Sequence, residues 1–438
     1  MIDISEGQET PQAIPQEISD IPAYRFLAFA AYIFCVLSLV DGLSPQFQMI
    51  IFGGHILVTG PIIRLVFLTI PILGSFVHPS IRNTRLPMLT WLICIAFLLV
   101  DTPHLILARG MTLKETLTSY SDYYLLLLMG PALLAFRGAI SERFIIRFTA
   151  ILLVVCAVIG FAQYFTGLPI LPIESVDQKF EVNSSNFFDD IRAFSLFTSG
   201  LGFGLFCALG GALGIALIRA APIKGIAFLV ISTVACYSTL TRLCYLVFVC
   251  TCLYALVLTF GKSLSRGLWL PFLYFLLAII TIIFGNSVSG DSSNLQSAGS
   301  LIMRIEEWTY YSGLIARSSL IDKLFGLGTV LSKKNLVPID NVPLALALHL
   351  GFVGLLLFEL LMLQMWLYLR RQALETQQPF IIAAASLWAT LLCAGMFNIV
   401  LISFGAVFAM VILCKKTPPT PMTQQFTNSI ESNENAFT

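Results

Sequence analysis

Charged side chains are scarce in this sequence of 438 residues. Asp, Glu, Lys and Arg together make up only 11% of it, whereas a typical soluble domain contains about 25%. Hydrophobic residues account for 57%, and the mean hydropathy is +0.88. This composition excludes an ordinary soluble domain and predicts a chain that lies mostly within a lipid bilayer. The net charge of +1 gives no indication of a nucleic-acid partner.

The sequence also lacks the patterns typical of disulfide frameworks, metal sites and secretion signals. All ten cysteines lie in or at the ends of apolar runs, which favours buried small side chains over disulfides or zinc ligands. No Gly-rich phosphate loop, Ser-His-Asp order or HExxH motif is present. Residues 1–23 contain acidic but no basic side chains, unlike a signal peptide, and we expect them to form a disordered cytoplasmic tail.

Long apolar runs dominate the rest of the chain. We predict an all-α polytopic membrane protein whose transmembrane bundle covers residues 24–414, followed by a second disordered cytoplasmic tail at 415–438. About twelve transmembrane helices are expected, because these runs are long enough to cross a bilayer with some tilt. Their approximate ranges are 24–41, 61–78, 87–103, 119–136, 143–167, 194–219, 222–239, 243–260, 267–285, 341–369, 379–396 and 397–414.

Basic residues in the short connections predict the orientation of the bundle. With both termini in the cytoplasm, every inside connection carries a basic pair, and the outside connections are poorer in Lys and Arg. Arg109 and Lys114 are the one outside pair that departs from this rule. The inside pairs are Arg82 and Arg85, Arg137 and Arg143, Arg219 and Lys224, Lys262 and Arg266, Arg370 and Arg371, and Lys415 and Lys416.

Two long connections are expected on the outside, at about 168–193 and 286–340, the second between the ninth and tenth helices. Within the second, residues 301–320 have the spacing of an amphipathic helix. The apolar face carries Leu301, Ile305, Trp308 and Ile315. The opposite face carries the charged residues Glu306, Glu307 and Arg317, and Arg304 lies at the boundary between the two faces. Such a helix is expected to lie at the outer membrane–water boundary over the bundle.

Three arginines and an acidic residue stand out on the predicted outer side. Arg192 precedes the sixth helix, Arg242 follows the short turn after the seventh, and Arg304 lies in the amphipathic helix. An arginine offers a planar, permanently charged set of donors that matches phosphate oxygens, so three of them at one cavity would suit a diphosphate. Asp340 and Asn341 open the tenth helix, and a carboxylate there could accept a proton from a hydroxyl group.

Each of these residues also has a purely structural interpretation. Arg192 could extend to the lipid headgroups, and Arg242 could cap the carbonyls of the preceding helix. Arg304 could pair with Glu307 on its own helix, and Asp340 could be the N-cap of the tenth helix. The N-cap role does not exclude a catalytic one.

Three further polar positions are weaker candidates. Arg64, in the second span, is interpreted as facing the cavity. His349 follows Asp340 by nine residues, which is half a turn out of phase, so we expect it to face away and bond a neighbouring helix. Asp189 and Asp190 have no third ligand at metal-site spacing, which favours a solvated loop or a counter-charge for the neighbouring arginine.

Four short segments, in this order and on one side, resemble the O-antigen polymerase and ligase superfamily of bacterial surface polysaccharide assembly. The resemblance covers nearly the whole chain and includes the number of helices and the late outside loop. The segments are Arg192 to Phe197 with its trailing glycines, Ser238 to Arg242, Arg304 to Trp308 with Gly326-Leu327-Gly328, and Asp340-Asn341 with His349 to Gly354.

The resemblance implies a glycosyltransferase at the outer face of the bacterial inner membrane. It would move a glycan from an undecaprenyl-diphosphate carrier to an acceptor hydroxyl, without a cofactor, a metal or a nucleotide sugar. Arg192 and Arg242 match the family arginines that hold the donor diphosphate, with Arg304 as the third. Arg192 and Asp340 are the candidate catalytic residues, and either Asp340 or an acidic residue of an outside loop could activate the acceptor. Asn341, Arg64 and Glu307 are further candidates.

The position of Asp340 favours one activity within this superfamily. The ligases usually have a histidine there, so the departure favours a polymerase of lipopolysaccharide or exopolysaccharide repeat units over a ligase. The expected partners are the lipid-linked donor, the glycan acceptor and, as a further candidate, a chain-length regulator. A transporter is the alternative of another class, but the sequence shows no internal repeat and concentrates its candidate residues at one face.

Overall fold

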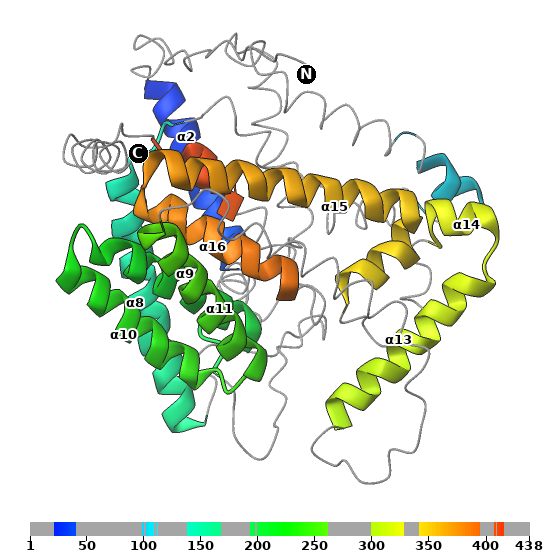
Figure 1. Ribbon diagram of the computed structural model, residues 1–438, viewed down its shortest axis with the longest axis horizontal. Coiled ribbons are helices and arrows are strands. Elements are labelled where there is room, and N and C mark those ends of the chain that lie inside the picture. Colours follow the sequence, from blue (N-terminus) through cyan, green and yellow to red (C-terminus); the bar gives the residue numbers. More distant parts are fainter. Residues whose placement is uncertain are drawn as a thin grey trace, which may run out of the picture.

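The computed structural model describes ten helices and the short segments beside them (Figure 1). The described residues are 22–40, 99, 102–108, 112, 138–167, 193–197, 199–261, 299–327, 341–394, 407–408 and 410–415. The helices are α2 (Pro22–Leu39), η2 (His104–Ala108), α8 (Glu142–Thr166), α9 (Gly200–Ile218), α10 (Pro222–Ser238), α11 (Arg242–Phe260), α13 (Gly299–Arg317), α14 (Leu320–Phe325), α15 (Val342–Thr376) and α16 (Pro379–Ala394). Over these ranges there is no strand, only an isolated bridge between Ile140 and Cys414.

Four of the described helices, α8, α9, α11 and α15, are long and apolar enough to cross a membrane. Two shorter helices, α10 and α16, are also apolar, over Pro222–Ser238 and Pro379–Leu392. Together they agree in position with the predicted spans at 143–167, 194–219, 222–239, 243–260, 341–369 and 379–396. The predicted spans at 61–78, 119–136 and 267–285 lie outside the described residues, as do most of 87–103 and 397–406. An all-helical membrane protein is the result.

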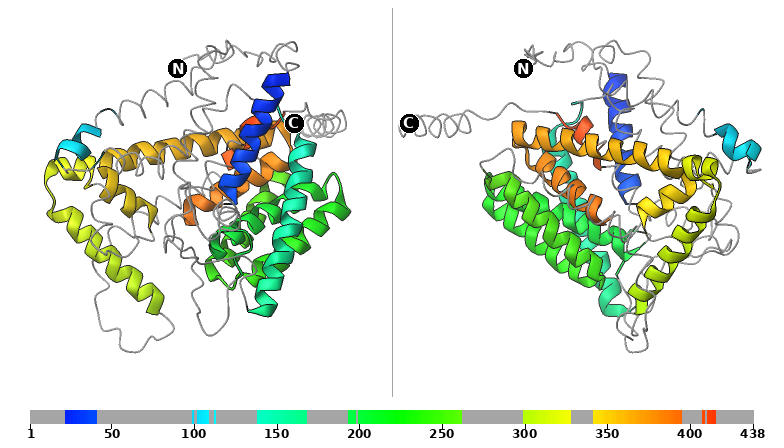
Figure 2. Two further views of the ribbon diagram at one scale, coloured as in Figure 1. Left: turned by 180° about the vertical axis from the view of Figure 1, so that it is seen from behind. Right: turned by 45° about the vertical axis from the view of Figure 1, so that its right-hand side comes forward.

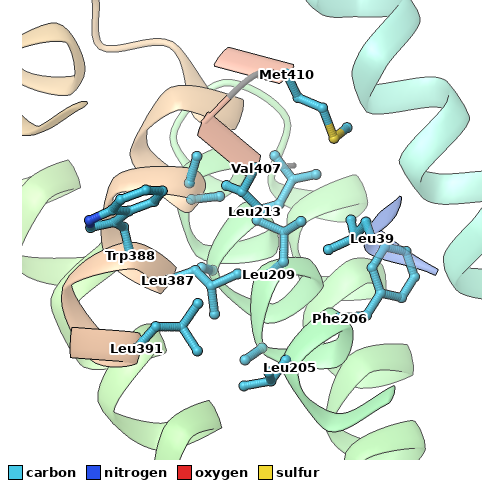
Figure 3. Packing of buried hydrophobic residues seen from close by; sticks show 14 of the residues in the cluster. Leu39, Leu205, Phe206, Leu209, Leu213, Leu387, Trp388, Leu391, Val407 and Met410 are labelled. Atoms are coloured by element: carbon cyan, nitrogen blue, oxygen red, sulfur yellow. The ribbon is translucent and has the colours of Figure 1, made fainter. Parts of the chain in front are cut away.

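Helix α9 lies at the centre of the core. Its sequence is apolar on every side, which is typical of a helix surrounded by others. Figure 3 shows how side chains of α9 meet those of α16 and α2: Leu209 lies towards Leu387 of α16, and Phe206 lies beside Leu39 of α2. Trp388 points away from α9, and its Nε1 donates to the Met362 carbonyl oxygen of α15. Close approach to α10 and α11 requires glycine, because a Cβ at Gly204 would collide with Cys244 and one at Gly214 with the backbone of Gly225.

The start of α9 differs from the sequence prediction. The helix begins at Gly200, six residues later than expected, with Ser199 as its N-cap: the Ser199 hydroxyl accepts from the Gly202 N–H at 3.2 Å. Ala193 to Phe197 are buried but not helical, and Ser195 has a left-handed φ of 53°. An apolar sequence alone does not distinguish such a buried irregular segment from a helical turn.

The amphipathic helix predicted at 301–320 is present as α13. Trp308 and Ile315 are buried, whereas Glu306 and Arg317 are exposed, so the predicted faces are confirmed for these four residues. Tyr311, which the prediction did not name, is also buried. The apolar face packs against the first part of α15, on Leu344, Ala345, Ala347 and Leu348. In Figures 1 and 2, α13 and α14 lie at the end of α15 that is farther from α8 to α11.

Helix α15 is broken at Gly351, which has a φ of 70° and a ψ of −179°. At this break the chain crosses the end of α14, and the Leu327 N–H donates to the Leu348 carbonyl oxygen at 2.7 Å. Gly326 has a φ of 89°, and a Cβ on it would collide with the backbone of His349. A Cβ on Gly351 would collide with the backbone of Leu324. The two glycines are therefore required by this crossing.

The end of the bundle predicted to face the cytoplasm is joined by bonds between distant segments. The Ile140 N–H donates to Leu413, and the Lys415 N–H donates to Ile140. The Glu142 carboxylate accepts from the Phe380 N–H at 3.1 Å, so the start of α8 caps the start of α16.

The basic pair predicted for an inside connection at this end, Arg370 and Arg371, instead lies within α15, which continues to Thr376. Arg371 is exposed and bonds Glu375, whereas Arg370 is buried over the ring of Trp366.

Candidate functional site

Only part of the predicted site falls within the described residues. Arg242 and Asn341 are described in full. Arg304 and Glu307 belong to α13, but their side chains lie outside the described part of the chain. Arg192, Asp340 and Arg64 lie outside it altogether, as do Asp189 and Asp190.

The segment that follows Arg192 is buried and is held by a single side chain of α8. Gln163 is completely buried, and its Oε1 accepts from the Phe194 N–H at 3.1 Å and from the Ser195 N–H at 2.7 Å. Its Nε2 donates to the Ser195 carbonyl oxygen at 3.4 Å. Non-helical backbone is tolerated in a membrane protein only where protein groups or a cavity satisfy it, and Gln163 does so here.

Ser195 supplies a second attachment to α8. Its hydroxyl donates to the Cys156 carbonyl oxygen at 2.7 Å, and the side chain has no exposed surface. Cys156 and Gln163 are seven residues apart and so lie on the same face of α8. This bond gives Ser195 a structural role and accounts for a left-handed conformation that a serine rarely adopts.

The same segment also touches the turn between α10 and α11. The Ala193 N–H donates to the Ser238 carbonyl oxygen at 3.2 Å, and Gly200 packs against Thr239 and Thr241. Arg192 is the residue before Ala193, and Arg242 follows Ser238 by four residues. The structure therefore brings together the two segments next to the two arginines, which are separated in sequence by the whole of α9 and α10.

Arg242 does not cap α10, contrary to the structural interpretation considered from the sequence. The last carbonyl oxygens of α10 and the turn accept from other groups: Cys236 from Thr239, Tyr237 from Leu240 and Tyr245, Ser238 from Ala193, and Thr239 from Thr241. Arg242 is the first residue of α11, and its side chain is exposed. It makes no hydrogen bond or ion pair with the residues that the structure describes.

Tyrosines surround this end of the bundle. The ring centroids of Tyr164 and Tyr237 are 6.4 Å apart, as are those of Tyr237 and Tyr245. These rings come from α8, α10 and α11, whose ends lie side by side (Figure 1). Partly exposed tyrosines at helix ends are typical of the membrane–water interface. The exposed side chain of Arg242 lies at the same end of α11 as Tyr245.

The N-cap of α15 is Asn341, not Asp340. The Asn341 side chain accepts from the Leu344 N–H at 2.9 Å and is 2% exposed, so its role is structural. Asp and Asn are both favoured at this position, and the sequence could not distinguish two adjacent candidates. The N-cap role considered for Asp340 therefore belongs to Asn341.

The third and fourth segments of the resemblance also meet each other. Gly326 contacts the backbone of His349, and Gly351 that of Leu324. His104 of η2 lies beside them, with its Nε2 at 3.2 Å from the Gly326 carbonyl oxygen. Gly326 and Gly351 thus serve the crossing of α14 and α15, a structural role.

Sequence reasoning missed Gln163, although a signal was present. It is a neutral polar side chain in an otherwise apolar span, and such residues are expensive in a bilayer unless they have partners. The described residues contain no cluster of three or more His, Cys, Asp or Glu side chains able to hold a metal. Comparison of the chain with known proteins gave no match to a family model and no match to a curated protein.

Proposed function

We propose that this protein is a membrane glycosyltransferase of the O-antigen polymerase type. It joins oligosaccharide repeat units carried on undecaprenyl diphosphate at the outer face of the bacterial inner membrane. Arg192 and Arg242 bind the donor diphosphate, Arg304 is the third arginine, and Asp340 is the general base. The acceptor is the sugar of a second lipid-linked unit.

One observation supports this proposal above the others. The bond between Ala193 and Ser238 ties the segment after Arg192 to the turn before Arg242, at an end of the bundle marked by interfacial tyrosines. Arg242 is exposed there and is not used by the helix ends around it. An arginine held at such a place without a partner among the described residues is costly, unless an anionic ligand receives it.

The proposed chemistry is a single displacement at the anomeric carbon of the donor sugar. The acceptor hydroxyl oxygen forms the new glycosidic bond and gives its proton to Asp340. The bond between the anomeric carbon and the phosphate oxygen breaks, and undecaprenyl diphosphate leaves with the bonding electrons. Negative charge grows on that leaving group, and fixed guanidinium groups in a water-poor site stabilise it.

Deletion of the gene tests the proposal. Surface glycans of the deletion strain are separated on a gel, and loss of the ladder above one repeat unit is expected for a polymerase. Full-length polymer left on its lipid carrier would instead identify a ligase. An unchanged profile of both polymer and attached glycan would remove the glycosyltransferase proposal. Complementation with Arg192→Ala should fail, although the variant reaches the membrane in normal amount.

A further inference from the structure

Gln163 has no part in the chemistry proposed above, yet it is the buried group on which the arginine-bearing region depends. We propose that Gln163 is a positioning residue for the donor diphosphate. It fixes the irregular segment after Arg192 against α8, and that segment in turn fixes the turn before Arg242. This inference rests on the proposed function, because it assigns Gln163 to the same diphosphate site.

Both ends of the Gln163 carboxamide are used. The oxygen accepts from two consecutive backbone N–H groups, those of Phe194 and Ser195, and the nitrogen donates to the Ser195 carbonyl. One neutral side chain thus supplies an acceptor and a donor to a segment that cannot satisfy itself. An apolar residue of the same size would leave two N–H groups unpaired in a completely buried place.

The geometry continues from Gln163 to Arg242 through described contacts. Ser195 is attached to α8 twice, through Gln163 and through the Cys156 carbonyl oxygen. Two residues earlier, Ala193 donates to Ser238. The face of α8 that carries Gln163 therefore sets the position of the turn, and also of the residue to which Arg192 is joined. A shift of the arginines relative to each other would be felt most by a ligand that bridges them.

The test is a binding measurement on the full-length protein in lipid nanodiscs, with farnesyl diphosphate as the probe. Gln163→Met keeps the length of the side chain and removes all three bonds. We expect its dissociation constant to rise about tenfold or more, because small misplacements of binding groups have effects of this size. Ser195→Gly removes the bond to Cys156 and relaxes the left-handed backbone, and a smaller loss in the same direction is expected.

A double-mutant cycle separates positioning from general stability. Once Arg192→Ala has removed one of the two groups that Gln163 positions, Gln163→Met should weaken binding by a smaller factor than it does in the wild type. Leu153→Ala is the matched control, since Leu153 is also buried on α8 and faces α9. The cavity that this substitution leaves should destabilise the same bundle. The affinity of the Leu153→Ala variant for farnesyl diphosphate should nevertheless equal that of the wild type.

The outcomes distinguish this inference from the proposed function. If the wild type does not bind the probe, the diphosphate site itself is disproved. A second outcome is that the wild type binds the probe, Arg242→Gln does not, and Gln163→Met binds normally. This outcome would overturn the positioning role of Gln163 but leave the proposed function standing. Additive losses in the cycle with Arg192→Ala would also overturn it. Should Gln163→Met not fold, wild-type affinity in Ser195→Gly decides against the inference.

Discussion

The hydroxyl of Tyr245 donates to the backbone carbonyl oxygen of Tyr237 at 2.9 Å, across the turn between α10 and α11. A side chain of the following helix thereby caps the end of the preceding one. Arginine is often found in that role near a helix end, and here Tyr245 makes it unnecessary. Arg242 follows the last residue of α10 by four positions, and its guanidinium remains available to a ligand.

Arg242→Lys is expected to lose activity without losing stability. A lysine keeps the charge but cannot match two phosphate oxygens with a planar pair of donors, so we expect the donor KM to rise at least tenfold, about 1.4 kcal/mol. The free energy of unfolding should change by less than about 0.5 kcal/mol, because the side chain is exposed and makes no described contact. Turnover is measured with a lipid-linked repeat unit in nanodiscs.

Tyr245→Phe is the control for this substitution. It removes the capping bond and should cost about 1 kcal/mol of stability, while the donor KM stays near that of the wild type. Normal kinetics in Arg242→Lys would show that the charge alone, or nothing at this position, is needed.

Gly351→Ala is expected to be strongly destabilising. The residue has a φ of 70°, and a Cβ there would collide with the backbone of Leu324, which has no room to move. Left-handed strain alone costs about 1–3 kcal/mol, and the collision adds to it. Thermal unfolding of the purified variants, followed by circular dichroism, measures the effect.

Gly313→Ala on α13 is the matched comparison. No atom lies within 4 Å of a Cβ placed at Gly313, so the alanine should stabilise the helix by about 0.5–1 kcal/mol. Equal stability of the two variants would contradict the crossing of α14 and α15 at Gly351.

Asp340 and Asn341 should respond oppositely to substitution. Asn341→Ala removes the N-cap of α15 and should cost about 1 kcal/mol of stability with a modest effect on turnover. Asp340→Asn should leave stability nearly unchanged but lower kcat by about 10²–10⁴-fold, which is the usual contribution of a general base. A fully active Asp340→Asn would transfer the role of base to another residue.

Chelation of metal ions should leave the reaction intact. We expect EDTA to have no effect on turnover, because fixed arginines, not a divalent cation, neutralise the leaving diphosphate in the proposed mechanism. The assay compares initial rates before and after dialysis against the chelator. Loss of activity that Mg²⁺ restores would point to Asp189 and Asp190 as metal ligands.

Hydrophobic patterning predicted the helices better than it predicted their ends. Trp308 and Ile315 were assigned to the buried face of α13, and this is confirmed, because their spacing follows directly from the helical period. The predicted start of α9 is wrong by six residues. Ala193 to Phe197 have the apolar composition of a membrane helix, but their backbone is held in a non-helical conformation by Gln163. The segment itself carries no sign of this bond, because the signal is a polar residue, Gln163, about thirty positions earlier in an apolar span.

The candidate site could be predicted by side and residue type, but not by contacts. The sequence placed Arg192 and Arg242 on one side of the membrane, and the described contacts between Ala193 and Ser238 agree with that arrangement. It did not predict the break at Gly351, because the positive φ there depends on where α14 passes. The glycine was visible in the sequence, while the reason for it is a tertiary contact.

The parallel bridge between Ile140 and Cys414 has a consequence for biosynthesis. Ile140 emerges from the ribosome early, whereas its partner is made only near the end of the chain, so the start of α8 stays unjoined during most of translation. A nascent chain stopped before residue 412 would lack this closure altogether. Ribosomal stalling late in the chain should therefore yield a protein whose first helices are inserted but whose α8 lacks the bridge between Ile140 and Cys414.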